Sequence, residues 1–178
     1  TAELGEGLAS AHADGICHRD VKPSNAFVRD DGRAVLLDFG IAARVGDASI
    51  TRTHTVLGTP SYMAPEQAMG RTDPHPALDV YGLTATLYHL LTLRPPHQGD
   101  LQQVLVALRR DDPPRAGRLV RGLPRDLQAI LDRGLERDPA RRYASMPDLV
   151  ADLRAFLAHA PVAARPLAVG QRLWRRAT

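Results

Sequence analysis

One short run of residues carries most of the chemistry that this sequence could perform: His18-Arg19-Asp20-Val21-Lys22-Pro23-Ser24-Asn25, with Asp38 further along. Phosphoryl transfer needs a carboxylate that takes a hydroxyl proton, oxygen ligands for Mg²⁺ and a cation near the transferred group. Asp20 can serve as the carboxylate and Lys22 as the cation. The side-chain oxygens of Asn25 and Asp38 suit a small, hard metal ion. The run therefore predicts a phosphoryl-transfer site.

The neighbouring residues explain how these side chains could meet. Pro23 fixes φ and discourages helix, so the run should form a tight loop. Asp30-Asp31-Gly32 predicts a turn between two short strands, residues 26–29 and 34–37. Because the strands of a hairpin pair, its two ends lie together, and Asn25 and Asp38 could share one metal ion.

Three motifs in order resemble those of protein kinases: the run from His18 to Asn25, Asp38-Phe39-Gly40, and Ala64-Pro65-Glu66. They are similar to the catalytic loop, the metal-binding motif and the end of the activation segment. Lys-Pro-Ser-Asn in the loop and the stretch 58–63 resemble the serine/threonine branch, of the bacterial, Hanks type. The resemblance implies ATP and Mg²⁺ as cofactors and protein substrates with serine or threonine acceptors.

The resemblance also implies a role for each matching catalytic residue. Asp20 would orient the acceptor hydroxyl and take its proton, and Lys22 would steady the γ-phosphate. Asn25 and Asp38 would hold Mg²⁺ together with the nucleotide. Thr59 would form a hydrogen bond near Asp20 and help to select serine and threonine acceptors.

Other matching residues would be structural. His18 would stack with Phe39, beside Gly40 of the metal-binding motif. Asp79 would hold the backbone of the catalytic loop from below. The remaining expected contact is an ion pair between Arg142 and Glu66, which would fasten the activation segment to the helices.

Residues 41–62 lack helical or strand periodicity and are rich in threonine, serine and glycine, which indicates a loop that would be the activation segment. Thr51 and Thr53 stand where similar bacterial kinases carry autophosphorylated threonines. Arg19 would bind such a phosphate through a bidentate contact. A loop rich in hydroxyl groups could instead serve solubility alone.

The expected fold is mainly α with a small β-hairpin, an α+β arrangement like the C-terminal lobe of a kinase. Apolar spacing predicts a helix at the start of the chain and four later helices, at 77–91, 101–109, 127–135 and 145–157. Leu83, Leu87, Leu90 and Leu91 would form the buried face of the first of these four. We assign residues 1–158 to the lobe and 159–178 to a basic tail rich in proline, alanine and arginine. No stretch resembles the glycine-rich loop or strand lysine of an N-terminal lobe, so we expect this piece alone to transfer no phosphate.

Composition excludes several other classes. The 178 residues, 44% of them hydrophobic, suffice for one domain with a core. Cys17 is the single cysteine, which rules out an internal disulfide and favours a reducing, cytoplasmic location. The net charge is +3, but the arginines are scattered among aspartates and form no basic stripe, which argues against nucleic acid as a partner. Histidines at 54, 75, 97 and 159 lack the spacing of a zinc site.

Four questions stay open from the sequence. The tail, with Arg172-Leu173-Trp174-Arg175-Arg176, could lie at the cytoplasmic face of a membrane or be a solvated end. A small-molecule phosphotransferase shares the loop chemistry but lacks the peptide platform of the Ala-Pro-Glu region. A catalytically inactive binding scaffold would share every motif. Nothing in the sequence indicates an oligomeric state.

Overall fold

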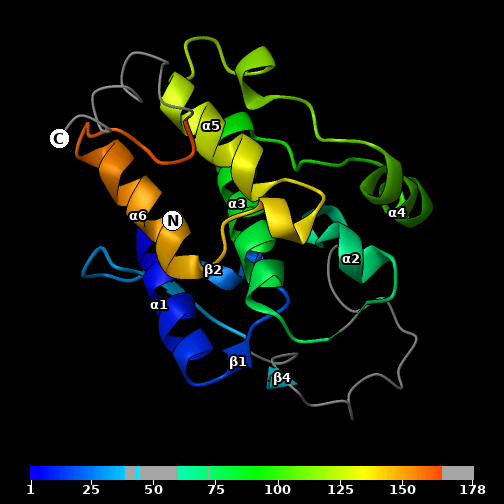
Figure 1. Cartoon of the computed structure of the whole chain (residues 1–178), viewed down its shortest axis with the longest axis horizontal. Coiled ribbons are helices and arrows are strands. Elements are labelled where there is room, and N and C mark those ends of the chain that lie inside the picture. The colour runs from blue at the N-terminus through cyan, green and yellow to red at the C-terminus, as the bar shows by residue number, and fades with distance from the viewer. Residues whose placement is uncertain (39–42, 45–59, 72, 166–178) are drawn as a thin grey trace, which may run out of the picture.

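A computed structural model describes residues 1–38, 43–44, 60–71 and 73–165 (Figure 1). The longer helices are α1 (Ala2–Ala13), α3 (Pro76–Thr92), α4 (Leu101–Arg110), α5 (Arg125–Gly134) and α6 (Met146–Leu157), with one short helix, α2 (Pro65–Ala68). The strands are β1 (Ile16–Cys17), β2 (Ala26–Val28), β3 (Ala34–Leu36) and β4 (Ala43–Arg44), and the 3₁₀ turns are η1 (Pro23–Asn25), η3 (Pro60–Tyr62), η4 (Ala116–Arg118) and η5 (Pro139–Arg141). The fold is mainly α with small antiparallel sheets, as the sequence predicts.

Helix α3 lies at the centre of the molecule, with α1 and α6 on one side and α5 beside it (Figure 1). It begins after His75, whose ring accepts a hydrogen bond from the Ala77 amide, and ends at Leu93, which has a φ of 56°. Its buried residues continue all round the first part of the helix, as expected of a helix enclosed by others. The predicted buried face is wrong at its end, since Leu90 is 56% exposed.

Two groups of apolar side chains form the core. One joins α1 and α6 to α3 and includes Leu8, Leu83 and Met146. Gly5 of α1 lies so close to α6 that a Cβ at this position would stand 2.5 Å from Val150. The other group joins α3 to α4 and α5 and includes Tyr88 and Leu131.

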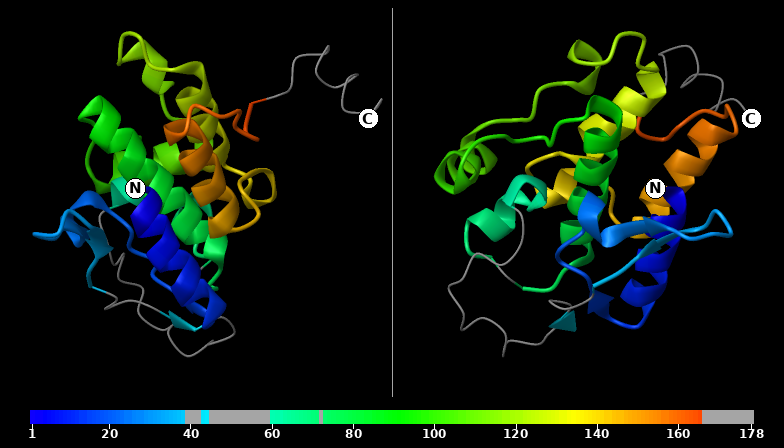
Figure 2. Two further views of the ribbon diagram at one scale, coloured as in Figure 1. Left: turned by 90° about the vertical axis from the view of Figure 1, so that its left-hand side faces the viewer. Right: turned by 180° about the vertical axis from the view of Figure 1, so that it is seen from behind.

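The predicted hairpin is present, and its strands are slightly shorter than expected. In β2 and β3, Phe27 pairs with Val35 in an antiparallel register. The turn between them uses Gly32, whose φ is 80°. Both views in Figure 2 show this hairpin projecting beyond the helices. A second sheet was not predicted: β1 pairs with β4, with Cys17 opposite Ala43, inside the segment expected to form only loop.

Residues after α6 turn back onto the helices. Buried Asp152 of α6 accepts hydrogen bonds from the amides of Ala163 (2.6 Å) and Ala164 (2.8 Å) and from the Tyr143 hydroxyl (2.8 Å). Val162 is buried, and Arg165 forms an ion pair with Asp126 at 2.9 Å. The proposed division at residue 158 stays a prediction, but 162–165 pack against the lobe. Among the described residues, no helix has the length and hydropathy needed to cross a bilayer.

Candidate active site

The catalytic run forms a tight polar cluster. Lys22 Nζ donates a hydrogen bond to Asp20 Oδ2 at 2.6 Å, and both side chains are about one-sixth exposed (17% and 16%). The amide nitrogen of Asn25 donates to the Asp20 carbonyl at 2.9 Å and to Oδ2 at 3.3 Å. The loop therefore brings Asp20, Lys22 and Asn25 to one point. Because the Asn25 nitrogen contacts Asp20, its amide oxygen is the atom that could reach a metal ion.

Backbone hydrogen bonds join the end of the hairpin to this cluster. The Leu37 amide donates to the Asn25 carbonyl at 2.8 Å, and His18 Nε2 contacts the Leu37 carbonyl at 3.2 Å. Asp38 is the next residue and is exposed. Pairing of the strands thus places Asp38 one residue from a direct contact with Asn25.

Two site residues have left-handed backbone conformations. Arg19 has a φ of 70° and Asp38 a φ of 63°. Such conformations cost on the order of 1–3 kcal/mol for a residue with a side chain and collect at functional sites, where surrounding contacts hold them. Aspartate tolerates this region better than arginine does, so the backbone at Arg19 needs the stronger support.

That support comes from Asp79 in the first turn of α3. Its Oδ1 accepts the Arg19 amide at 2.7 Å and its Oδ2 accepts the His18 amide at 2.8 Å. The contact that the kinase resemblance implies is therefore present. Gly82, one turn later, lets the loop approach closely, since a Cβ there would stand 3.0 Å from Val21.

A third donor to Asp79 was not predicted. His12, in the last turn of α1, lies with its Nε2 2.7 Å from Asp79 Oδ2. The two residues are 67 positions apart. No local pattern could have identified the pair, although a histidine in a mainly apolar helical segment was a signal worth following.

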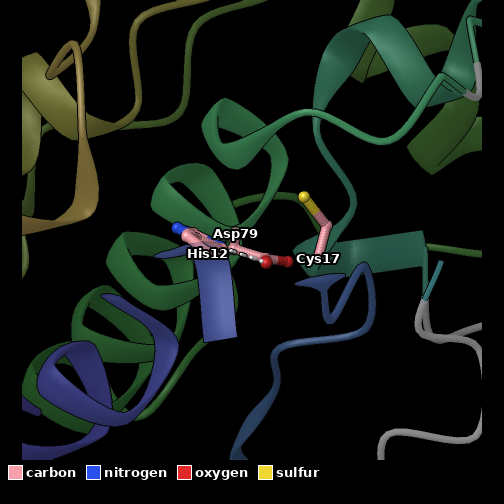
Figure 3. A group of neighbouring side chains, drawn as sticks. All are labelled: His12, Cys17 and Asp79. Atoms are coloured by element: carbon pink, nitrogen blue, oxygen red, sulfur yellow. Dashed lines mark hydrogen bonds and ion pairs between the residues drawn. The ribbon is translucent and has the colours of Figure 1, made fainter. Parts of the chain in front are cut away.

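His12, Cys17 and Asp79 hold their potential metal-ligand atoms within 4.8 Å of one another, the one such group within the described ranges (Figure 3). Two observations argue against a metal site. The Asp79 oxygens already accept two backbone amides and His12. Burial and, next, the Asp79 carboxylate raise the pKa of the Cys17 thiol to about 11, which disfavours the thiolate that binds metals. Figure 3 shows an interaction between His12 and Asp79 only.

The ion pair of Glu66 and Arg142 is also present. Arg142 donates to both carboxylate oxygens of Glu66, at 2.6 and 2.7 Å. It also donates to the carbonyls of Glu136, Ala77 and Arg137. The Arg142 side chain is fully buried, so α2 is joined to α3 and to the η5 region by a charge that has no access to water.

Arg19 faces the same region from the catalytic loop. Its carbonyl accepts the Gln67 amide of α2 at 3.3 Å. Its Nε is buried and has no hydrogen-bond partner within the described part of the chain. This nitrogen is therefore a buried donor without an acceptor among the described residues.

Five of the predicted residues lie outside the described residues: Phe39, Gly40, Thr51, Thr53 and Thr59. Their predicted roles stay predictions. Two apolar residues of the hairpin, Phe27 and Leu37, were not predicted as site residues and are 50% and 47% exposed. The available signal was their position in the predicted strands, within two residues of Asn25 and Asp38.

A family model described as protein kinase domain matches residues 1–153. The chain belongs to the protein kinase family. Similar proteins include the serine/threonine-protein kinases PknL and PknE of Mycobacterium tuberculosis, 42% identical over 152 residues and 40% over 158. PknH of Mycobacterium bovis is 38% identical over 148 residues.

These matches cover most of this chain and a minor part of each relative. They span 84%, 89% and 83% of the chain for PknL, PknE and PknH, and 38%, 28% and 25% of the respective relatives. The kinase family generally uses ATP and Mg²⁺, and the donor set of Asp20, Lys22, Asn25 and Asp38 fits that pair of cofactors.

Proposed function

We propose that the protein containing this chain is a serine/threonine protein kinase that transfers the γ-phosphate of ATP to protein hydroxyls. One observation carries the proposal: Lys22 and Asn25 both contact Asp20 Oδ2, beside the hairpin end that bears Asp38. A base, a cation and two oxygen ligands are then within reach of one transferring group. The similarity to PknL and PknE, which are named serine/threonine-protein kinases, supports the acceptor class.

The proposal gives each carboxylate and amide oxygen of the site a task that the contacts support. Both described contacts to the Asp20 side chain fall on Oδ2, so Oδ1 can accept the proton of a substrate hydroxyl. Lys22 then lies where it can balance negative charge on the transferred group. The Asn25 amide oxygen and the Asp38 carboxylate would hold Mg²⁺, which neutralises phosphate charge when bound.

The exposed apolar side chains of Phe27 and Leu37 fit the same proposal. They lie on the hairpin directly beside the residues that would hold metal and phosphate. A flat aromatic base could cover these side chains while its phosphates reach Asn25 and Asp38. We assign the hairpin to the nucleotide side of the site and the region of α2 to the protein substrate.

We further propose that phosphorylation of Thr51 or Thr53 regulates the enzyme through Arg19. The Nε of Arg19, buried and without a partner among the residues that the structure describes, would gain an acceptor from a phosphate group. Mass spectrometry of the active full-length protein should find phosphate on one of these threonines. Active protein without phosphate between residues 49 and 55 would contradict this switch.

The main test is phosphate transfer from radiolabelled ATP by the full-length protein. We expect Mg²⁺-dependent labelling of the protein itself or of an added serine/threonine peptide, lost in Asp20→Asn. A folded full-length protein that binds ATP but labels nothing would favour the inactive scaffold. Labelling of a small metabolite but no protein would favour the small-molecule phosphotransferase.

A further inference from the structure

The loop between α4 and α5 carries arginines without acidic neighbours. Residues 115–125 contain Arg115, Arg118, Arg121 and Arg125 and no aspartate or glutamate. All four arginines are exposed. Arg115 forms an ion pair with Asp132 at 2.6 Å, whereas the other three have no ion-pair partner among the described residues. The scattered charge expected from the sequence therefore does not extend to this loop, which presents three unpaired positive charges.

The backbone of this loop is held in place. The amides of Leu119 and Val120 donate to the carbonyl of Ala116, at 2.9 and 2.8 Å, and Ala116 is fully buried. Gly122, with a φ of 80°, turns the chain toward α5. The Leu119 side chain is 43% exposed and lies in sequence directly after one unpaired arginine and two residues before the next. The loop thus presents an apolar side chain among arginines.

This arginine loop lies far from the proposed active site. The hydroxyl of Tyr88 in α3 donates to the Pro114 carbonyl at 2.8 Å, just before the loop. Asp79, which holds the catalytic loop, is nine residues earlier in α3, roughly 14 Å along the helix axis. Figure 1 shows the light-green segment around η4 at the upper edge of the molecule and β1, which leads into the catalytic loop, at the lower edge, and Figure 2 agrees. A partner bound to the arginine loop would leave the reaction face open.

The described chain also ends beside this loop. Arg165 forms an ion pair at 2.9 Å with Asp126, the residue that follows Arg125. Beyond Arg165 the sequence has no acidic residue and adds three arginines and the single tryptophan: Arg172, Trp174, Arg175 and Arg176. Two basic segments, distant in sequence, are therefore joined at the first turn of α5.

The chemistry of the arginine loop fits a lipid bilayer better than other anionic partners. Residues 111–125 contain no aromatic side chain on which a nucleic-acid base could stack. A phosphopeptide is bound by arginines that converge on one group, whereas these are spread along a projecting loop. A bilayer offers many anionic headgroups above an apolar layer, which matches arginines on both sides of an exposed leucine.

We propose that residues 115–125 form a docking surface for an anionic phospholipid bilayer. Arg118, Arg121 and Arg125 contact lipid phosphates, and Leu119 enters the interface between headgroups and acyl chains. The inference goes beyond the proposed function and does not depend on phosphate transfer, because the arginine loop and the reaction face lie at opposite ends of α3.

The test uses the full-length protein and vesicles of phosphatidylcholine, with or without about one-third phosphatidylglycerol as the anionic lipid. The test variant carries Arg118→Gln, Arg121→Gln and Arg125→Gln together. The matched control removes the same charge from exposed arginines elsewhere on the surface: Arg71→Gln, Arg94→Gln and Arg141→Gln together. The measurements are cosedimentation with vesicles, hydrogen exchange of residues 116–125 and thermal stability.

We expect the wild type to bind the anionic vesicles and exchange of residues 116–125 to slow on them, with neither effect on neutral vesicles. The test variant should bind about 100-fold more weakly, since each arginine near an anionic surface contributes about fivefold. The control variant should bind nearly as the wild type does. Raising the salt concentration to about 0.5 M should release most of the protein. Leu119→Ser should bind more weakly and keep this salt dependence, because only an apolar contact is lost.

Three outcomes would overturn the inference. The first is equal exchange of residues 116–125 on anionic and neutral vesicles. The second is an equal loss of binding in the test and control variants, which would reveal an effect of net charge alone. The third is equal protection of residues 116–125 by soluble glycerol phosphate or by duplex DNA, which would reveal a general anion site. Where another segment of the full-length protein holds every variant on the vesicles, the exchange of residues 116–125 decides the question.

Discussion

The reaction face and the helical base of this molecule use polar residues in opposite ways. On the reaction face, Asp20, Lys22 and Asn25 are close in sequence and contact one another, with Asp38 exposed beside them. In the base, several polar partners are buried and far apart in sequence. Glu66 and Arg142, for example, are separated by 76 positions.

This difference predicts whether a substitution mainly changes the rate of the reaction or the stability of the fold. Groups on the reaction face keep partial access to water, so their removal leaves few unsatisfied partners and mainly affects chemistry. Groups in the base hold segments together without water, so losing one partner strands the other. Asp79 belongs to both regions, since it is buried like the base and bonded to the loop of the face.

The largest expected effect separates the two regions most clearly. Asp20→Asn should lower kcat by about 10²- to 10⁴-fold, because the proposed general base is lost. Asn25 and Lys22 still have an amide oxygen to contact, so the melting temperature should change little. Phosphate-transfer assays and thermal denaturation of the same samples check this. A large loss of stability would show that the face also supports the fold.

Arg142→Ala should have the reverse profile. It leaves the Glu66 carboxylate partly buried and unpaired, at a cost of about 3–5 kcal/mol in the free energy of unfolding. The control is Arg154→Ala, which removes an exposed pair with Glu6 and should cost about 1 kcal/mol or less. Chemical denaturation measures both. If both substitutions lowered the free energy of unfolding equally, the proposed difference between buried and exposed ion pairs would be wrong.

A smaller effect tests local stabilisation of the base. Ser145 caps α6 by accepting the Asp148 amide, while Asp148 accepts the Ser145 amide in return. Ser145→Ala should lower the free energy of unfolding by about 1 kcal/mol and leave kcat unchanged. Denaturation curves with parallel activity assays provide the measurement. A fall in kcat larger than the fall in stability explains would connect α6 to the reaction face.

The smallest predicted effect depends on pH. Burial lowers the pKa of His97 from its ordinary value near 6.5, against the opposing influence of Asp111 and Asp112. The unfolded chain therefore binds the proton first, so stability falls as pH drops below about 6.5 toward the lower pKa of the folded state. His97→Gln should lose less stability than the wild type over this interval. If the stability of both proteins had the same pH dependence, His97 would not contribute to it.

Local rules predicted the parts of the fold that depend on nearby residues. The hairpin followed from the turn at Asp30-Asp31-Gly32, and the cap of α6 from Ser145. The family resemblance supplied the pairs of Asp79 with the loop and of Glu66 with Arg142. These contacts cross sixty positions or more, and no periodicity in the sequence would have shown them.

The misses have physical causes as well. The pairing of β1 with β4 involves two residues on each side, too few for an alternating pattern. Leu90 fits an apolar helical spacing, but its exposure depends on which neighbours cover it in the fold, which spacing alone does not give. His12 was overlooked because its partner comes from another helix and because the proposed chemistry gave it no task.

The hydrogen bonds from the Ala163 and Ala164 amides to Asp152 fix the end of the lobe to α6. The chain therefore leaves the lobe at Arg165 from a position held by the Ala163 and Ala164 amides, and not from a free end of α6. Tension applied there would first load these bonds and then α6, which meets α1 where Gly5 and Val150 leave no clearance. The end of the lobe is thus connected through α6 to α1, the helix that leads into the catalytic loop.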